Sequence, residues 1–176
     1  YTPGYVREKP LTIIGPTNTE KFLSDCRDLY GDWLLPRDEY PLHIYQLDSE
    51  QVALKDCLIT ARPAFHSKNS NGYRIESDDG SLMYSGDSGP CDSLIKLAAD
   101  VNLALIECAF PDDEPLEKHM TPKQAAEIAA KAGAKKLLLT HFYPHMDNID
   151  VVAACKNIYR NPINIAEDLA CYNVGS

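Results

Sequence analysis

Four side chains that can bind metals or move protons occupy comparable places along this sequence. His66, His119 and His141 lie at or just beyond the end of an expected strand, or just before a helix, and Asp87 is placed likewise. Imidazole and carboxylate groups suit zinc, iron and manganese, and a carboxylate shared by two cations offsets their mutual repulsion. The set indicates a metal site, although each residue taken singly also fits a capping, surface or turn role.

The elements that must position these residues alternate between helix and strand in the second half of the chain. A turn at Asp78-Asp-Gly80 and apolar runs bounded by turn residues predict this order. The expected elements are a hairpin over 73–84, helices at 91–99, 122–132 and 149–159, and strands at 103–108, 136–140 and 163–166. Because strand ends project side chains over the edge of a sheet, an α/β fold of this kind can gather the four residues.

The first half is richer in strands. The expected elements there are strands at 11–14, 42–47 and 52–61, and a helix capped by Asn18 or Thr19 that runs to about Leu29. The best local signal of the chain lies in the second half, where Thr121-Pro-Lys-Gln124 has the residues of a capping box with proline at the first helical position. Gly133 then provides a usual helix stop.

Length and composition favour one ordinary core. With 176 residues, of which 44% are hydrophobic, we expect a single domain over residues 1–176. A net charge of −9 argues against a surface built mainly to hold nucleic-acid phosphates, which lysine and arginine would neutralise.

The cysteines and the apolar runs indicate the cellular compartment in which the protein is expected. The six cysteines are scattered without a CxxC pair, so they are expected to be reduced core residues. No apolar run approaches the roughly 20 residues that span a bilayer, and the first residues lack the regions of a signal peptide. These features predict a cytoplasmic protein without a membrane partner.

Five short blocks of this sequence form a recognisable combination. The blocks are His66-Ser-Lys-Asn-Ser-Asn-Gly-Tyr-Arg-Ile75, Tyr84-Ser-Gly-Asp-Ser88, Leu105-Ile-Glu-Cys-Ala-Phe110, His119-Met-Thr-Pro and Leu137-Leu-Leu-Thr-His141-Phe. Together they resemble the metallo-β-lactamase superfamily, nearest to its ribonuclease Z-like branch. The similarity covers roughly residues 10 to 170 in the family's order, and the combination is specific where a single block would not be.

The resemblance implies roles for the four residues. His66 would be a ligand of one metal, Asp87 would bridge two, and His141 would bind the second. His119 would be a proton donor or oxyanion stabiliser near the scissile phosphate, with closure of a turn as its alternative. The implied cofactors are two divalent ions, zinc first, with iron or manganese as alternatives.

One family block is absent from this sequence. The family's His-x-His-x-Asp-His signature supplies most of the remaining ligands, and it lies upstream of the segment that resembles residues 10–16. We therefore expect residues 1–176 to form a single partial domain, the C-terminal half of an αββα sandwich. Neither metal would have the three protein ligands of a catalytic zinc, so this chain alone is expected to be inactive, with its metal sites open to being empty.

Neighbouring polar residues suggest how a substrate is held. Lys68, Asn69 and Ser70 offer donors to an anion, with a solvated loop as the simpler reading, and Glu107 is expected to orient a histidine or to cap a backbone turn. Only 21 positions separate His66 from Asp87, where tRNA-processing members often insert an arm that grips tRNA. A small or cyclic phosphodiester is therefore favoured over tRNA.

Two other functions stay open. The chain can be a non-catalytic module that binds a partner chain carrying the missing ligands, or a homodimer in which two copies cover an exposed sheet. It can also be an ester, thioester or lactone hydrolase that keeps the metals and changes the substrate.

Overall fold

The computed structural model describes residues 7–31 and 40–175. Contacts divide the chain into two compact units, residues 1–48 and 49–176, and each is described by itself. The single partial domain expected over residues 1–176 stays a prediction, because two compact units can belong to one domain.

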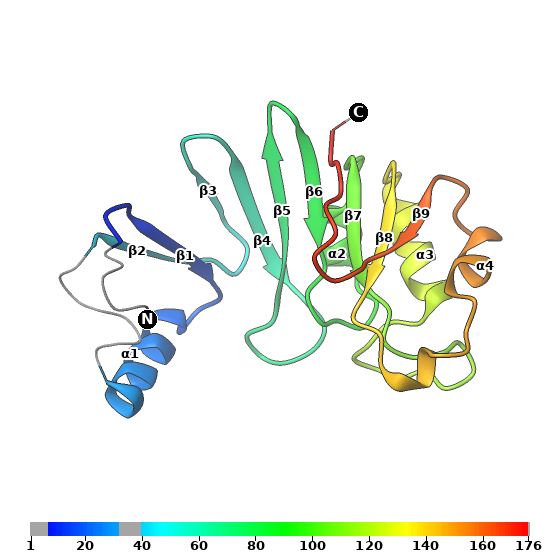
Figure 1. Ribbon diagram of the computed structural model, residues 1–176, viewed down its shortest axis with the longest axis horizontal. Coiled ribbons are helices and arrows are strands. Elements are labelled where there is room, and N and C mark those ends of the chain that lie inside the picture. Colours follow the sequence, from blue (N-terminus) through cyan, green and yellow to red (C-terminus); the bar gives the residue numbers. More distant parts are fainter. Residues whose placement is uncertain (1–6, 32–39, 176) are drawn as a thin grey trace. The chain divides into compact units, whose positions relative to one another are not determined.

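The first unit is a small parallel β-α-β arrangement (Figure 1). Strand β1 (Leu11–Gly15) pairs in parallel with β2 (Leu42–Gln46), and helix α1 (Thr19–Tyr30) connects them. Of the two expected capping residues, Asn18 occupies the N-cap position, but it has a left-handed backbone (φ 71°) and its side chain makes no capping hydrogen bond. The Thr19 hydroxyl instead donates to the Pro16 carbonyl at 2.6 Å, which closes the turn before the helix.

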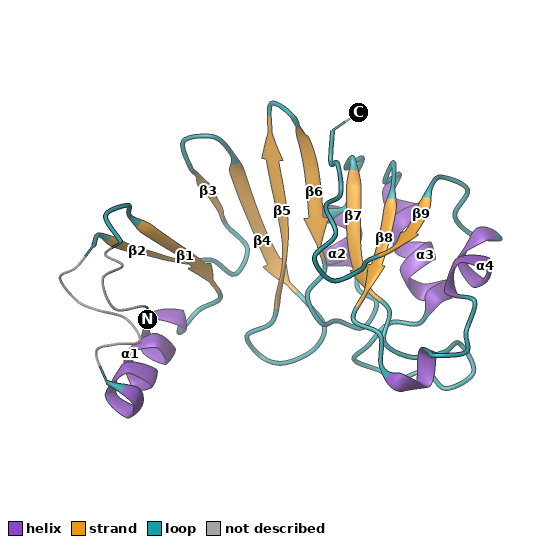
Figure 2. Ribbon diagram, viewed as in Figure 1, coloured by secondary structure: helices purple, strands orange, loops and turns teal. Residues whose placement is uncertain are grey.

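The second unit is built on a seven-stranded mixed sheet in strict sequence order (Figure 2). Strands β3 to β6 are antiparallel to their neighbours, and β6 to β9 are parallel. The strands are β3 (Gln51–Ala53), β4 (Leu58–Pro63), β5 (Asn71–Ser77), β6 (Gly80–Tyr84), β7 (Leu103–Glu107), β8 (Leu137–Thr140) and β9 (Ile163–Ile165). The single strand expected over 52–61 is wrong, because a turn at Lys55 and Asp56 folds that segment into the β3–β4 hairpin.

The helices of this unit are short and pack on one face of the sheet. They are α2 (Asp92–Leu97), α3 (Pro122–Ala132), the 3-10 turn η1 (Pro144–Met146) and α4 (Val151–Lys156). The capping box of α3 and the left-handed stop at Gly133 are confirmed. Helix α4 is shorter than the expected 149–159, because the Asp150 side chain caps it at the Ala153 amide and Asn157 ends it.

The core lies between the sheet and α2, α3 and α4. Met83, Ala104, Ile106 and Leu139 are fully buried there, and each large apolar side chain contributes roughly 1.5–3 kcal/mol through its burial. Arg74 faces the same side, since its guanidinium donates to the carbonyls of Leu97 and Ala99.

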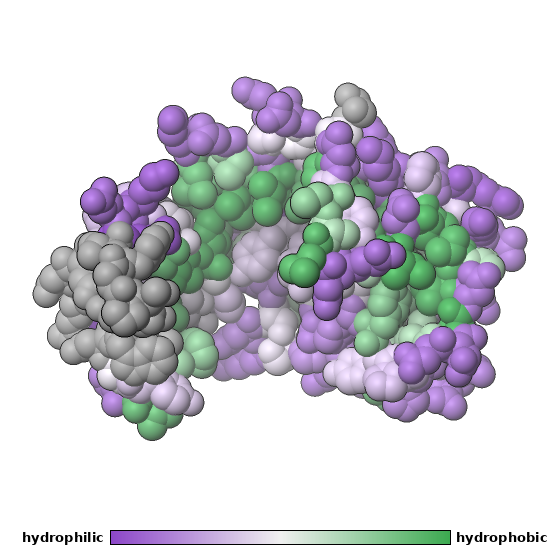
Figure 3. Space-filling view, viewed as in Figure 1, coloured by the Kyte–Doolittle hydropathy of each residue, from purple (hydrophilic) through white to green (hydrophobic). Residues whose placement is uncertain are grey.

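The opposite face of this sheet is more open. Strand alternation places Tyr73, Ile75, Leu82 and Tyr84 on it, away from Met83. Figure 3 shows apolar surface over these strands. Part of the face is crossed by the C-terminal segment, whose Gly175 carbonyl accepts a hydrogen bond from Lys136 (Figure 1). The expected α/β class, a mixed sheet with helices packed on it, is confirmed.

Candidate functional site

The candidate site lies at one edge of the larger sheet. Strands β4 and β6 run in the same direction because each is antiparallel to β5, and β7 and β8 are parallel to β6. Their carboxyl ends therefore meet at the same edge, where α/β folds place their sites. His66, Asp87 and His141 follow β4, β6 and β8, and Glu107 is the last residue of β7.

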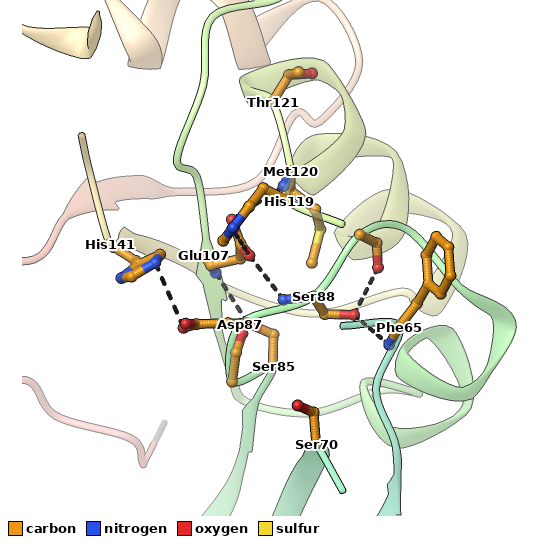
Figure 4. A network of polar contacts seen from close by, with 12 residues as sticks. Phe65, Ser70, Ser85, Asp87, Ser88, Glu107, His119, Met120, Thr121 and His141 are labelled. Atoms are coloured by element: carbon orange, nitrogen blue, oxygen red, sulfur yellow. Dashed lines mark hydrogen bonds and ion pairs between the residues drawn. The ribbon is translucent and has the colours of Figure 1, made fainter. Parts of the chain in front are cut away.

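Glu107 is the buried centre of this region (Figure 4). Its side chain is 1% exposed, and Oε1 accepts hydrogen bonds from the Ser88 amide at 2.7 Å and from Nδ1 of His119 at 2.9 Å. Its Oε2 accepts from the Met120 amide at 3.0 Å. A buried carboxylate needs such donors to offset its desolvation. The carboxylate thereby ties the loop after β6 to the loop before α3.

Two buried serines extend this connection. Ser85 Oγ accepts from the Glu107 backbone amide at 2.9 Å. Ser88 Oγ accepts from the Phe65 amide at 2.9 Å and donates to the Gly89 carbonyl at 2.6 Å. The loops that follow β4, β6 and β7 are therefore held together by side-chain to backbone hydrogen bonds.

His119 is fixed on two sides. Its Nδ1 contacts Glu107, and the next residues lead directly into the capped first turn of α3. Because a carboxylate accepts, Nδ1 carries a proton, which leaves Nε2 as the atom that can exchange a proton with a substrate. This placement is compatible with the proton-donor role expected for His119.

His141 and Asp87 form the second contact of the site. His141 Nε2 lies 3.5 Å from Asp87 Oδ1, and this nitrogen is buried without a hydrogen-bond partner among the described residues. His141 also has a left-handed backbone (φ 64°), as does Gly86 (φ 60°) just before Asp87. Left-handed conformations of residues other than glycine are strained and cluster at functional sites.

His66 lies against His119. Their ring centroids are 5.0 Å apart in an edge-to-face arrangement, and His119 in turn stacks at 5.8 Å on His141. The three imidazoles therefore form a continuous row along the sheet edge. His66 contacts His119 at one end of the row, and Asp87 lies beside His141 at the other.

The segment after His66 turns back on itself. The Ser70 hydroxyl lies 2.7 Å from the Ser67 hydroxyl, so it contributes to closing this turn, while Lys68 and Asn69 are exposed. Their expected contact with a substrate stays a prediction.

The charge of the site affects one nearby side chain. Burial raises the pKa of Tyr84, and the carboxylates of Asp87 and Glu107 raise it further. Both effects disfavour ionisation of the Tyr84 phenol.

The donor set fits part of a metal site. Two ligands of one tetrahedral zinc ion are about 3.4 Å apart, given metal–ligand bonds of about 2.1 Å. The 3.5 Å between His141 Nε2 and Asp87 Oδ1 matches that separation, and the unpartnered buried nitrogen is what a metal would satisfy. Among residues 7–31 and 40–175, however, no group of three or more such side chains is arranged to hold an ion. These residues can supply ligands and do not complete a site by themselves.

Sequence reasoning missed two aromatic residues of this region. Phe110 and Tyr143 stack on each other at 5.1 Å, and Tyr143 meets the rings of both His119 and His141. Their position was the available signal, since Phe110 comes three residues after β7 and Tyr143 three residues after β8.

Comparison with known proteins gives consistent matches. Residues 10–142 match the Beta-lactamase superfamily domain. Uncharacterized protein Rv1339 of Mycobacterium tuberculosis is 34% identical over 168 residues, which cover 93% of this chain and 61% of that protein. The chain thus spans less than two thirds of that relative's length.

Two further matches carry descriptive names. Ribonuclease Z of Myxococcus xanthus is 36% identical over 216 aligned positions, which cover 92% of this chain and 70% of that enzyme. The metallo-beta-lactamase fold protein YhfI from Bacillus subtilis superposes with a TM-score of 0.74 at 25% identity, over 90% of this chain and 63% of that one. In the described ranges, no helix is long and apolar enough to cross a membrane.

Proposed function

This chain belongs to the beta-lactamase superfamily, and from that premise we propose that the complete protein is a metal-dependent phosphodiesterase. The membership confirms the resemblance noted in the sequence. The observation that carries the proposal is the row of three imidazoles beside Asp87, with His119 held by the buried Glu107.

In the proposed reaction, Asp87 and His141 would be metal ligands, with His66 as a further donor. When bound, two divalent ions supply a hydroxide at neutral pH and neutralise charge on the phosphoryl oxygens. Zinc is proposed first, because imidazole and carboxylate suit it, with iron or manganese as alternatives. The remaining ligands would come from outside the described residues.

The residues of this chain would handle the leaving group. Glu107 accepts a hydrogen bond from His119 Nδ1, which leaves Nε2 as the nitrogen that can carry a transferable proton. A proton held on Nε2 would pass to the departing oxygen, and His119 would become neutral while keeping its bond to Glu107. The backbone amides of Ser88 and Met120 keep the carboxylate in place during this transfer.

A small phosphodiester fits better than tRNA. Between His66 and Asp87 the chain forms only a turn and the β5–β6 hairpin, so no protruding arm is present there. The ribonuclease Z match extends over 216 aligned positions, more than the 176 residues of this chain, so that relative contains segments without a counterpart here. The net charge of −9 supports the same choice.

The test measures metal content and turnover of bis(p-nitrophenyl) phosphate by the full-length protein. We expect about two metal ions per chain, and Asp87→Ala should remove most metal and lower turnover at least a hundredfold. Asp113→Ala, which changes an exposed aspartate before α3, is the matched control and should retain both. A metal-free, inert wild type would favour the binding-module alternative, and faster hydrolysis of p-nitrophenyl acetate than of the phosphodiester would favour an esterase.

A further inference from the structure

Three aromatic rings form a continuous group beside the histidine row. Phe110 stacks on Tyr143 with ring centroids 5.1 Å apart and planes inclined by 21°. His145 lies against Phe110 at 5.5 Å. We call Phe110, Tyr143 and His145 the aromatic platform.

The platform belongs to two loops that the fold holds together. Phe110 follows β7, and Tyr143 and His145 follow β8. The Tyr143 amide donates to the Ala109 carbonyl at 3.4 Å, which joins the two loops at the base of the rings. The platform is therefore fixed to the same sheet edge as Glu107 and His141.

Packing of the core does not explain these rings. Phe142 packs against the core cluster, whereas its neighbour Tyr143 is 40% exposed and His145 is exposed as well. An exposed group of stacked rings next to polar catalytic groups is more typical of a ligand-binding surface than of a core.

We infer that the aromatic platform binds the base of a nucleotide substrate by stacking, which makes the substrate a nucleotide phosphodiester with an unpaired base. This inference rests on the proposed phosphodiesterase function. The Tyr143 ring lies 5.9 Å from the His119 ring and 5.4 Å from the His141 ring. A base and its phosphate are separated by a single sugar, so a base on Tyr143 leaves the phosphate within reach of these histidines.

Stacking also suits the charge of this protein. With 26 acidic and 17 basic residues, the chain has a net charge of −9, which does not attract phosphates over a distance. Base stacking supplies affinity without cationic side chains and tolerates different bases, because every base has a π-face. The platform would therefore select for the presence of a base more than for its identity.

The first test compares two diesters with the same leaving group, thymidine 5′-(p-nitrophenyl phosphate) and methyl p-nitrophenyl phosphate, in the full-length protein. Stacking on one aromatic ring predicts that Tyr143→Leu lowers the ratio of their kcat/KM values by about tenfold. Tyr143→Phe should keep the ratio, as should Tyr30→Leu, which removes an exposed tyrosine from α1. An unchanged ratio in Tyr143→Leu, with native circular dichroism, would overturn the inference.

A binding test separates this inference from the proposed function. Trp33 is the only tryptophan in these 176 residues. In the full-length protein, Tyr143→Trp in a Trp33→Phe background therefore adds one fluorophore on the platform, and its signal is isolated by subtracting that of the Trp33→Phe parent. Saturable quenching by AMP and none by ribose 5-phosphate would support base stacking, even if the wild type hydrolysed neither diester and the phosphodiesterase proposal failed. Equal quenching by both ligands, or no quenching by either, would overturn the inference that the platform binds a base. The phosphodiesterase proposal would then still depend on its own test.

Discussion

At the scale of single residues, Glu107 connects the stability of the site with its chemistry. Its carboxylate is only 1% exposed and accepts from one imidazole and from the backbone amides of the buried Ser88 and Met120, so water does not replace it as the acceptor for these two amides. A residue in this position cannot be assigned to fold or to function alone, because the same bonds hold the Asp87 loop and orient His119.

Glu107→Gln should therefore lower the free energy of unfolding by about 2 kcal/mol, because an amide cannot accept all three hydrogen bonds and leaves a buried donor unsatisfied. Urea denaturation measures the change. Glu127→Gln is the control, since Glu127 forms an exposed pair with Lys131 that contributes little. A loss in Glu107→Gln no larger than in the control would mean that the carboxylate is not needed to hold the two loops.

Among the candidate metal ligands, His141 has two features that lower the stability of the folded chain. His141 adopts a strained backbone and keeps a buried nitrogen without a partner. Both features cost stability in the isolated chain, and a bound cation next to Asp87 would offset the second of them.

At the scale of elements, the capping box at the start of α3 restrains the backbone that leads from His119 into the helix. The Thr121 amide donates to the Gln124 side chain at 3.0 Å, while the reciprocal bond from the Gln124 amide to the Thr121 hydroxyl is longer, at 3.5 Å. Because the hydroxyl makes the weaker half of the box, Thr121→Ala should cost about 0.5–1 kcal/mol of unfolding free energy, near the low end for a lost cap.

Thermal unfolding of Thr121→Ala would measure this loss, with Lys118→Ala as a control in the same exposed loop. A loss above about 2 kcal/mol would show that Thr121, which is 3% exposed, matters mainly through its packing.

Two buried thiols make the packing of the core sensitive to alkaline pH. Burial raises the pKa of Cys155 on α4 to about 12, and burial followed by the nearby Cys155 raises that of Cys108 after β7. In the unfolded chain both thiols would ionise near their ordinary value of 9.0. The folded state therefore binds more protons than the unfolded state above that pH.

The stability that these thiols contribute should be fully present below pH 9 and lost as the pH rises toward 12. Urea titrations of the wild type and of Cys155→Ala at pH 8, 9 and 10 would measure it. The variant should show a shallower decline, because one of the two linked protons is gone. Parallel declines in the two proteins would mean that other groups, such as Tyr159, govern alkaline stability.

At the scale of the whole molecule, the sequence was most informative where local signals agree with the fold. The capping residues of α3 and the apolar runs of β7 and β8 predict their elements because buried parallel strands and capped helices carry local patterns. The segment 52–61 was not divided from its pattern, because the turn at Lys55 and Asp56 contains no glycine or proline to mark it.

For the candidate site, the sequence predicts which side chains lie at one sheet edge but not which backbone groups bond to them. Histidines and an aspartate at strand ends could be placed on one sheet edge from the element order. The amide donors of Ser88 and Met120 could not, because every residue type except proline has such a donor and only the fold selects which ones point at Glu107. The stacking of Phe110 on Tyr143 likewise depends on two loops that are distant in sequence.

The two units should differ in how firmly they hold their helices. Helix α1 has no buried residue and exposes Phe22, Leu29 and Tyr30, whereas α3 buries Ala125, Ile128 and other residues against the core. Local stability follows the apolar area that an element buries, so α1 should open far more often than α3.

Hydrogen exchange of the full-length protein, followed by mass spectrometry, would measure this difference. Amides of α3, β7 and β8 should exchange at least about a hundredfold more slowly than those of α1, because opening them requires loss of the core. Phe22→Ser would serve as a control, since it should leave exchange in both helices nearly unchanged if the Phe22 side chain is free in solution. Equal protection of α1 and α3, with faster exchange of α1 in Phe22→Ser, would show instead that the apolar side of α1 is covered in the full-length protein.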